Sequence, residues 1–115
     1  MKIAPEMRPE FVSAMNEVAE ARASRLYEEG LDLELDSDFE GAVAKYDELL
    51  LENGFYKDAL SRRKTCLGFV ELAQRLYGEA KQANGPGARL DKLKQIAVFW
   101  PEYRDVEKQI AKLEG

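Results

Sequence analysis

The sequence predicts an all-α protein in which antiparallel helical hairpins, about five helices in all, stack into a short solenoid. Strand patterns are almost absent, whereas apolar residues recur at helical spacing through most of the chain. The chain also repeats itself. Residues 25–30 read Arg-Leu-Tyr-Glu-Glu-Gly, and residues 75–80 read Arg-Leu-Tyr-Gly-Glu-Ala. Self-similarity at a period of roughly 45–50 residues is typical of stacked helical repeats.

A second repeated pattern accompanies the first. In residues 9–14, 54–59 and 101–106, an aromatic side chain precedes Ser or Asp by two positions, and Ala or Val follows. Repeats of this kind bury their apolar faces only against their neighbours. We therefore expect the protein to act through an extended surface rather than an enclosed pocket.

The first two predicted helices have clear boundaries. The first begins after Pro9, a residue suited to a helix start, and runs to about Leu35. Residues 36–38, Asp-Ser-Asp, end it because short polar side chains compete for backbone hydrogen bonds and cap the next helix. The second helix spans roughly residues 39–52. Asn-Gly at 53–54 ends it because both residues tolerate the left-handed conformation of a helix C-terminus.

Three further helices complete the prediction. The third starts near residues 56–58 and runs to about Ala83, and Asn-Gly-Pro-Gly at 84–87 is the clearest break in the chain. The fourth covers about residues 88–99. A turn at Trp100-Pro101 precedes the fifth, which runs from Pro101 to about Leu113. We therefore expect a single domain of residues 1–115. Its repeat units are roughly residues 10–53 and 56–100, with a capping helix at 101–114.

Composition argues against catalysis. The 115 residues suffice for one domain but not two, and they include no histidine, the commonest general base and metal ligand. The single cysteine, Cys66, falls on an apolar helical stripe, as expected of an inert core thiol. Gly85-Pro86-Gly87 matches no phosphate-binding motif. We expect no enzyme activity, no catalytic residue, no cofactor and no metal site.

The same composition indicates a compartment. No stretch approaches the roughly 20 apolar residues of a membrane span, and the N-terminus lacks the apolar run of a signal peptide. A lone cysteine is typical of a reducing environment. We expect a cytoplasmic protein with no membrane insertion.

Charge is distributed unevenly along the chain. The net charge is −5, but residues 1–54 hold 14 acids and 5 bases, whereas residues 55–115 hold 8 acids and 12 bases. An acidic half and a basic half favour head-to-tail association or steering of a charged partner. Random scatter of charges over solvated helix faces is the alternative, because surface charges are weakly constrained.

Residues 26–59 resemble a tetratricopeptide repeat, a motif of two antiparallel helices. That family places a small residue in the first helix, another twelve positions later, an aromatic four beyond that, and usually a proline eight further on. Here these positions are Gly30, Ala42, Tyr46 and, in place of proline, Gly54. The resemblance implies that small residues let the two helices approach closely while the aromatic ring fills the gap.

The second unit, residues 76–106, is similar to the family only loosely. Ala80 stands in place of the glycine, and Pro101 supplies the proline. Its hairpin is a few residues shorter, and the period of nearly 50 residues exceeds the family's 34. A three-helix module of the microtubule-interacting-and-transport type has a similar Ala/Tyr rhythm in one hairpin, but the internal repeat argues against it.

The resemblance also implies a binding groove, since the first helix of each repeat lines the concave face in this family. The positions that match are Ser24, Tyr27, Leu31, Glu34, Gln74, Tyr77, Lys81 and Asn84. Tyrosines are frequent interface anchors, but Tyr27 and Tyr77 are equally explained as packing residues that repeat with the architecture. Tyr27 and Leu31 occupy positions where a clamp for a chaperone's C-terminal carboxylate needs Lys and Asn, so we expect no such clamp.

Two charged segments are candidate binding sites. Residues 31–38 alternate acids, but Ser37 and Val43 fall where an EF-hand-like calcium loop needs Gly and a bidentate acid. Acidic side chains at the C-terminal end of a helix interact unfavourably with the helix dipole. Their position either indicates a basic partner or has no functional significance. A basic patch is also present, formed by Lys57, Arg62, Arg63 and Lys64. The net charge argues against nucleic acid as its ligand and favours an acidic segment of a protein.

The sequence thus predicts a non-catalytic protein-interaction adaptor that presents a helical groove to a peptide or helix of a partner protein. The alternative is a structural module that self-associates into a homo-oligomer through its acidic N-terminal and basic C-terminal halves. No nucleic-acid partner is expected.

Overall fold

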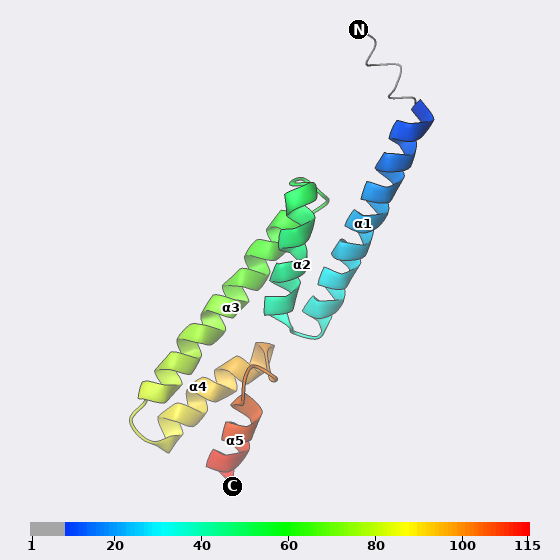
Figure 1. Ribbon diagram of the computed structural model, residues 1–115. Coiled ribbons are helices and arrows are strands. Elements are labelled where there is room, and N and C mark those ends of the chain that lie inside the picture. The colour runs from blue at the N-terminus through cyan, green and yellow to red at the C-terminus, as the bar shows by residue number, and fades with distance from the viewer. Residues whose placement is uncertain (1–8) are drawn as a thin grey trace.

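The computed structural model describes residues 9–115, with side chains from Met15 onward, and these residues contain five helices and no strand (Figure 1). The prediction of an all-α fold is confirmed. The helices are α1 (Pro9–Leu35), α2 (Phe39–Glu52), α3 (Ala59–Gln82), α4 (Pro86–Phe99) and α5 (Val106–Glu114). Successive helices run antiparallel, as expected for hairpins joined by short turns (Figure 1).

Each helix packs chiefly against the next one in the chain. Helix α3 is longer than either of its neighbours. Helix α2 lies along its first half, and α4 lies along its second half (Figure 1). Ion pairs mark these two contacts, Arg63 with Asp47 of α2 and Glu79 with Lys92 of α4. The two hairpins are therefore arranged in tandem along α3, and a stack of helical hairpins describes them.

The close contact between α1 and α2 depends on Gly30. A Cβ atom placed on Gly30 would lie 2.7 Å from Cζ of Tyr46, closer than real Cβ contacts allow. The Tyr46 ring is fully buried, and its hydroxyl donates a hydrogen bond to Glu34. The small residue thus admits the aromatic ring, which is the packing that the sequence led us to expect of Gly30 and Tyr46.

Aromatic rings fill the junction between the two hairpins. Phe69, halfway along α3, lies with its ring centroid 4.6 Å from that of Phe39 and 5.5 Å from that of Phe99. Phe39 also meets Trp100 edge to face at 5.2 Å. Because Phe39 begins α2 and Phe99 ends α4, this cluster brings the start of one short helix to the end of the other.

The turns after α2 and α4 have the same conformation. In each, two backbone hydrogen bonds span three residues, from Tyr56 to Asn53 and Ala59 to Tyr56, or from Tyr103 to Trp100 and Val106 to Tyr103. Lys57 and Arg104 take matching positive φ values of 42° and 48°. Two of the three repeated sequence segments, 54–59 and 101–106, are therefore this turn, whereas residues 9–14 have helical backbone within α1.

The predicted boundaries were correct for α1 and α2 and differ slightly for α3 and α4. The fifth helix is a correction, because α5 begins at Val106 rather than at Pro101. Residues 101–105 belong to the turn, and the helical hydrogen-bond pattern begins only where Gln109 N–H donates to the Asp105 carbonyl.

Candidate functional site

The predicted groove residue Tyr27 lies in the hydrophobic core. Its side chain is 8% exposed, its hydroxyl donates a hydrogen bond to Asp58, and its ring centroid is 5.7 Å from that of Tyr56. The Lys57 ammonium lies 5.1 Å from the centre of the Tyr27 ring, within cation–π range. Tyr27 thus joins α1 to the turn before α3, which favours the packing role that the sequence left open.

Arg62 completes the cluster that Tyr27, Tyr56 and Asp58 form. Its Nε donates to Asp58 at 3.0 Å and to the Tyr27 hydroxyl at 3.3 Å, and its Nη1 lies 3.3 Å from Glu34. The Tyr27 hydrogen bond lowers the pKa of Asp58, and the same hydroxyl raises the pKa of Arg62, so both side chains are charged at neutral pH.

The second unit repeats the arrangement. The Tyr77 hydroxyl donates to Asp105 at 2.7 Å, and its ring meets Tyr103 edge to face at 5.7 Å. Gln109 occupies the place of Arg62 and donates to Asp105 at 2.8 Å and to the Tyr77 hydroxyl at 3.1 Å. Arg104 takes the place of Lys57, 5.2 Å from the Tyr77 ring centre. Each repeated tyrosine therefore joins its own helix, by a hydrogen bond, to the turn that follows the next helix.

The other predicted groove residues are placed less uniformly. Leu31 and Glu34 are partly buried, whereas four are exposed: Ser24, Gln74, Lys81 and Asn84. Lys81 lies 5.1 Å from the Tyr77 ring centre. Among the described residues, no hydrogen bond, ion pair or aromatic contact joins the predicted positions on α1 to those on α3 and its end.

The predicted basic patch is largely matched by acids of the same chain. Arg62 pairs with Glu34 and Asp58, and Arg63 pairs with Asp47. Lys57 lies over tyrosine rings, and Lys64 is exposed. Little uncompensated positive charge is left there for an external partner.

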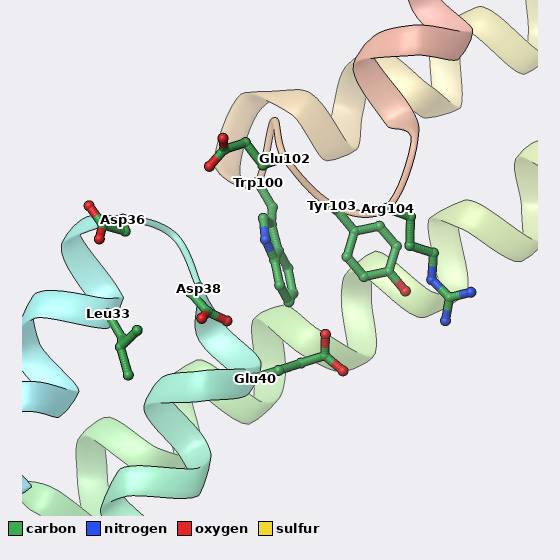
Figure 2. A pocket seen from close by; sticks show the side chains of 8 residues that line it. All are labelled: Leu33, Asp36, Asp38, Glu40, Trp100, Glu102, Tyr103 and Arg104. Atoms are coloured by element: carbon green, nitrogen blue, oxygen red, sulfur yellow. The ribbon is translucent and has the colours of Figure 1, made fainter.

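A different surface forms a cavity at the junction of the two hairpins. It has a volume of about 450 Å³ and lies where the α1–α2 turn meets the α4–α5 turn (Figure 2). We call it the acidic–aromatic pocket, and its lining residues are Leu33, Asp36, Asp38, Glu40, Trp100, Glu102, Tyr103 and Arg104. The buried rings of Trp100 and Tyr103 form one wall, and carboxylates of both turns surround them (Figure 2).

The pocket carries four carboxylates and one cation. Two of the acids also serve α2, because Asp38 accepts a 3.0 Å hydrogen bond from Gly41 N–H and Glu40 lies in the first turn of the helix. The cation, Arg104, lies against the Tyr77 and Tyr103 rings, and the Tyr103 hydroxyl raises its pKa. Asp36 and Glu102 form no ion pair within the described chain, so the pocket retains negative charge.

This chemistry suits an organic cation. Aromatic walls attract a guanidinium or ammonium group through their π faces, and carboxylates at the rim pair with it. Among the described residues, no three carboxylate or cysteine side chains are arranged to hold a metal ion.

Sequence reasoning missed the pocket. Asp36 and Trp100 are far apart in the chain, and the packing of Phe39 and Phe69 against Trp100 and Phe99 brings their turns together. One signal pointed towards it, namely the acids at the end of the first helix, which oppose that helix dipole and suggested a basic partner.

Cys66 is fully buried, and burial raises the pKa of its thiol to about 11. A thiol of this kind is a poor nucleophile at neutral pH. No described helix is both long enough and apolar enough to cross a membrane.

Comparison with protein-family models, with curated proteins and with solved structures found no match. The fold and the pocket therefore define the chain by class, as an all-α protein of tandem helical hairpins with an acidic–aromatic pocket at their junction.

Proposed function

We propose that the protein is a non-catalytic, tetratricopeptide-like adaptor that holds a basic peptide or helix of a partner protein. The observation that carries the proposal is the acidic–aromatic pocket, whose walls come from both hairpins. Since the pocket exists only when the two hairpins are packed together, a folded scaffold presents it preformed, which lowers the entropy lost on binding.

The family-like part of the proposal is supported by packing at the first hairpin. Gly30 admits Tyr46, and Ala42 is fully buried between α1 and its neighbours, as the spacing of these residues in that family requires. The repeated Tyr–Asp contacts of the two units support a repeat architecture independently.

The chemistry of the pocket favours arginine or lysine as the anchor residue. A guanidinium that enters the pocket would lie beside the small exposed part of the Trp100 ring and donate hydrogen bonds to the carboxylates of Glu40 and Glu102. An acidic partner or a nucleic acid would be repelled by the same carboxylates and by the net charge of −5. The lone buried cysteine fits the cytoplasm as the place where the adaptor acts.

Trp100 provides a direct readout, because it is the single tryptophan of the chain and lines the pocket. The experiment titrates the protein with a hexa-arginine peptide and with a hexa-glutamate peptide while tryptophan emission is recorded. We expect saturable emission changes with hexa-arginine only. The affinity should fall as salt is added, because the carboxylates at the rim are screened.

Paired variants locate the binding. Glu40→Gln/Glu102→Gln removes two pocket charges and should weaken hexa-arginine binding several-fold. Glu71→Gln/Glu107→Gln removes two exposed charges outside the pocket lining and is the matched control. Equal affinities in the two double variants would contradict the pocket assignment. No emission change with hexa-arginine would contradict the proposed ligand class.

A further inference from the structure

The turn between α2 and α3 carries a depression, at the opposite end of α2 from the acidic–aromatic pocket (Figure 1). Its volume is about 310 Å³, and most of its surface is apolar. Phe55 in this turn is 96% exposed, and Leu60 near the start of α3 is 47% exposed. We call it the Phe55 depression, and its lining includes Phe55, Lys57, Asp58, Leu60, Ser61 and Lys64.

The fold does not require these apolar side chains. The turn after α4 has the same backbone conformation, with Arg104 in the place of Lys57. At the positions that correspond to Phe55 and Leu60, that turn and its helix have Glu102 and Glu107. Since the same turn forms with glutamates there, packing within the chain does not account for Phe55 and Leu60. Exposed apolar side chains that share one depression are typical of a contact surface.

Positive charge borders the depression. Lys57 and Lys64 both line it and are exposed, and neither forms an ion pair within the described chain. The carboxylate of the lining, Asp58, is engaged by Arg62 at 3.0 Å and by the Tyr27 hydroxyl. A carboxylate that enters the depression would therefore meet two unpaired ammonium groups and no unpaired acid of the lining.

The ammonium group of Lys57 is held in place. It lies 5.1 Å from the centre of the Tyr27 ring and 5.5 Å from that of the Tyr56 ring, within cation–π range. The side chain nevertheless stays exposed, so that its N–H groups can still donate to an acceptor. Binding to a lysine that is already ordered costs less entropy than binding to a mobile one.

We propose that the Phe55 depression binds an acidic, amphipathic segment of a partner protein. Apolar side chains of the segment would cover Phe55 and Leu60, and its carboxylates would pair with Lys57 and Lys64. With a basic segment in the acidic–aromatic pocket, the protein would join two partners of opposite charge. The inference rests on the depression and does not depend on the pocket.

An anionic bilayer fits the depression less well. A bilayer presents a broad negative plane to the whole chain, whose net charge is −5. Two lysines are also fewer than the clusters of about four or more basic residues that bind proteins to such surfaces. A short acidic segment needs only the few side chains that line the depression.

Fluorescence anisotropy of a dye-labelled peptide tests the proposal. The probe is a capped amphipathic helix of leucine, alanine and glutamate, and its twin carries glutamine in place of every glutamate. We expect saturable binding of the glutamate peptide and several-fold weaker binding of the glutamine twin. Added salt should weaken the binding of the glutamate peptide only, because it screens the ion pairs. Trp100 emission should not change, since Trp100 does not line the depression.

A first pair of variants tests the apolar contact. Phe55→Ser should weaken binding of the glutamate peptide about tenfold, as loss of an aromatic anchor does. Val98→Ser is the matched control, because Val98 is an exposed apolar residue on α4, 86% exposed, outside the depression. Circular dichroism confirms the helix content of both variants.

A second pair tests the charges. Lys57→Gln/Lys64→Gln should weaken binding of the glutamate peptide several-fold and should remove its salt dependence. Lys108→Gln/Lys112→Gln is the matched control, since it removes two exposed lysines of α5 that form no ion pair within the described chain. Circular dichroism again confirms that both variants fold.

Absence of binding would overturn the proposal, and so would equal affinities of a variant and its matched control. Two further outcomes would assign the depression to another occupant. Co-sedimentation with phosphatidylserine vesicles that Phe55→Ser abolishes would assign it to a bilayer. A mass of twice 13.1 kDa by light scattering that Phe55→Ser halves would assign it to a second copy of the chain.

Discussion

The hydroxyl of Tyr77 donates a 2.7 Å hydrogen bond to Asp105, and in the preceding unit the hydroxyl of Tyr27 donates to Asp58 in the same way. Each bond ties a long helix to the residue that precedes the next helix. The repeated sequence pattern therefore marks a joint that holds one hairpin to the following element. The hydroxyl groups of its tyrosines are therefore engaged within the fold.

Removing the Tyr27 hydroxyl should destabilise the fold. Tyr27→Phe leaves Asp58 without this donor and should lower the free energy of unfolding by about 1 kcal/mol. Tyr77→Phe should have a smaller effect, because Tyr77 is less buried than Tyr27. Urea denaturation followed by circular dichroism measures both. Tyr56→Phe is the control, since this buried ring has no hydroxyl partner within the described chain, and an equal loss there would refute the role of the hydrogen bond.

Stability should depend on pH through the same joints. Hydrogen bonds from the tyrosines lower the pKa values of Asp58 and Asp105 in the folded state. The unfolded state therefore binds protons more readily, so this stabilisation is present above the ordinary aspartate pKa and is lost as the pH falls below it. Thermal unfolding at a series of acidic pH values should show a smaller loss for Asp58→Asn/Asp105→Asn than for the wild type. An equal loss of stability at acidic pH in the variant and the wild type would argue against this role of the two aspartates.

At alkaline pH the dependence of stability on pH has the opposite sign. The carboxylates of Asp58 and Asp105 raise the pKa values of Tyr27 and Tyr77. Their contribution is complete below the ordinary tyrosine pKa, about 10, and is lost as the pH rises through the folded-state value. Absorbance at 295 nm should show these two phenols ionising later than in the unfolded chain.

Gly30→Ala should destabilise the first hairpin. The added methyl would clash with the Tyr46 ring, which is buried and tied to Glu34. Overpacking costs about 1–3 kcal/mol, more than the gain of up to about 1 kcal/mol from replacing a helical glycine. Gly68→Ala on α3 is the control, because nothing lies within 4 Å of the new methyl, and it should be stabilising.

The second unit suggests how the clash is relieved. It has Ala80 where the first unit has Gly30, and Leu93 where the first has Tyr46. In a Tyr46→Leu background, Gly30→Ala should therefore be neutral or stabilising, which a double-mutant cycle measures as a coupling energy. Additive losses in the double variant would contradict the packing account.

The Cys66 thiol should react slowly in the folded protein. Burial raises its pKa to about 11, so both access and thiolate population are low at pH 8. Labelling with a chromogenic disulfide reagent should proceed at the rate at which the fold opens, whereas urea-unfolded chain should label at once. Fast labelling of the native protein would show that the core around α3 is open.

Strong local signals explain why most of the fold could be predicted. Pro9, the Asp-Ser-Asp turn at 36–38 and the Asn-Gly pair at 53–54 each act on the adjacent backbone, and the boundaries of α1 and α2 follow them. Pro101 suits both a helix start and a turn, and the choice depends on how Trp100 and Tyr103 pack. The start of α5 could therefore not be deduced from local pattern alone.

The candidate site was harder to predict for a related reason. Helical spacing puts Tyr27 on a stripe, but it does not say whether a second helix covers that stripe. The pocket depends on the contact between Phe39 and Trp100, which brings together two turns that are distant in sequence. Such juxtapositions follow from tertiary packing, and only the unfavourable position of the acids near Asp36 hinted at one.

The most direct test of the central claim is a backbone amide NMR titration with hexa-arginine. If the acidic–aromatic pocket binds basic segments, shift changes should concentrate at residues 36–40 and 100–104, and Ser24 and Gln74 should stay unchanged. Changes concentrated instead at Ser24, Gln74, Lys81 and Asn84 would restore the predicted groove and contradict the pocket. An absence of shifts anywhere would contradict binding of basic segments altogether.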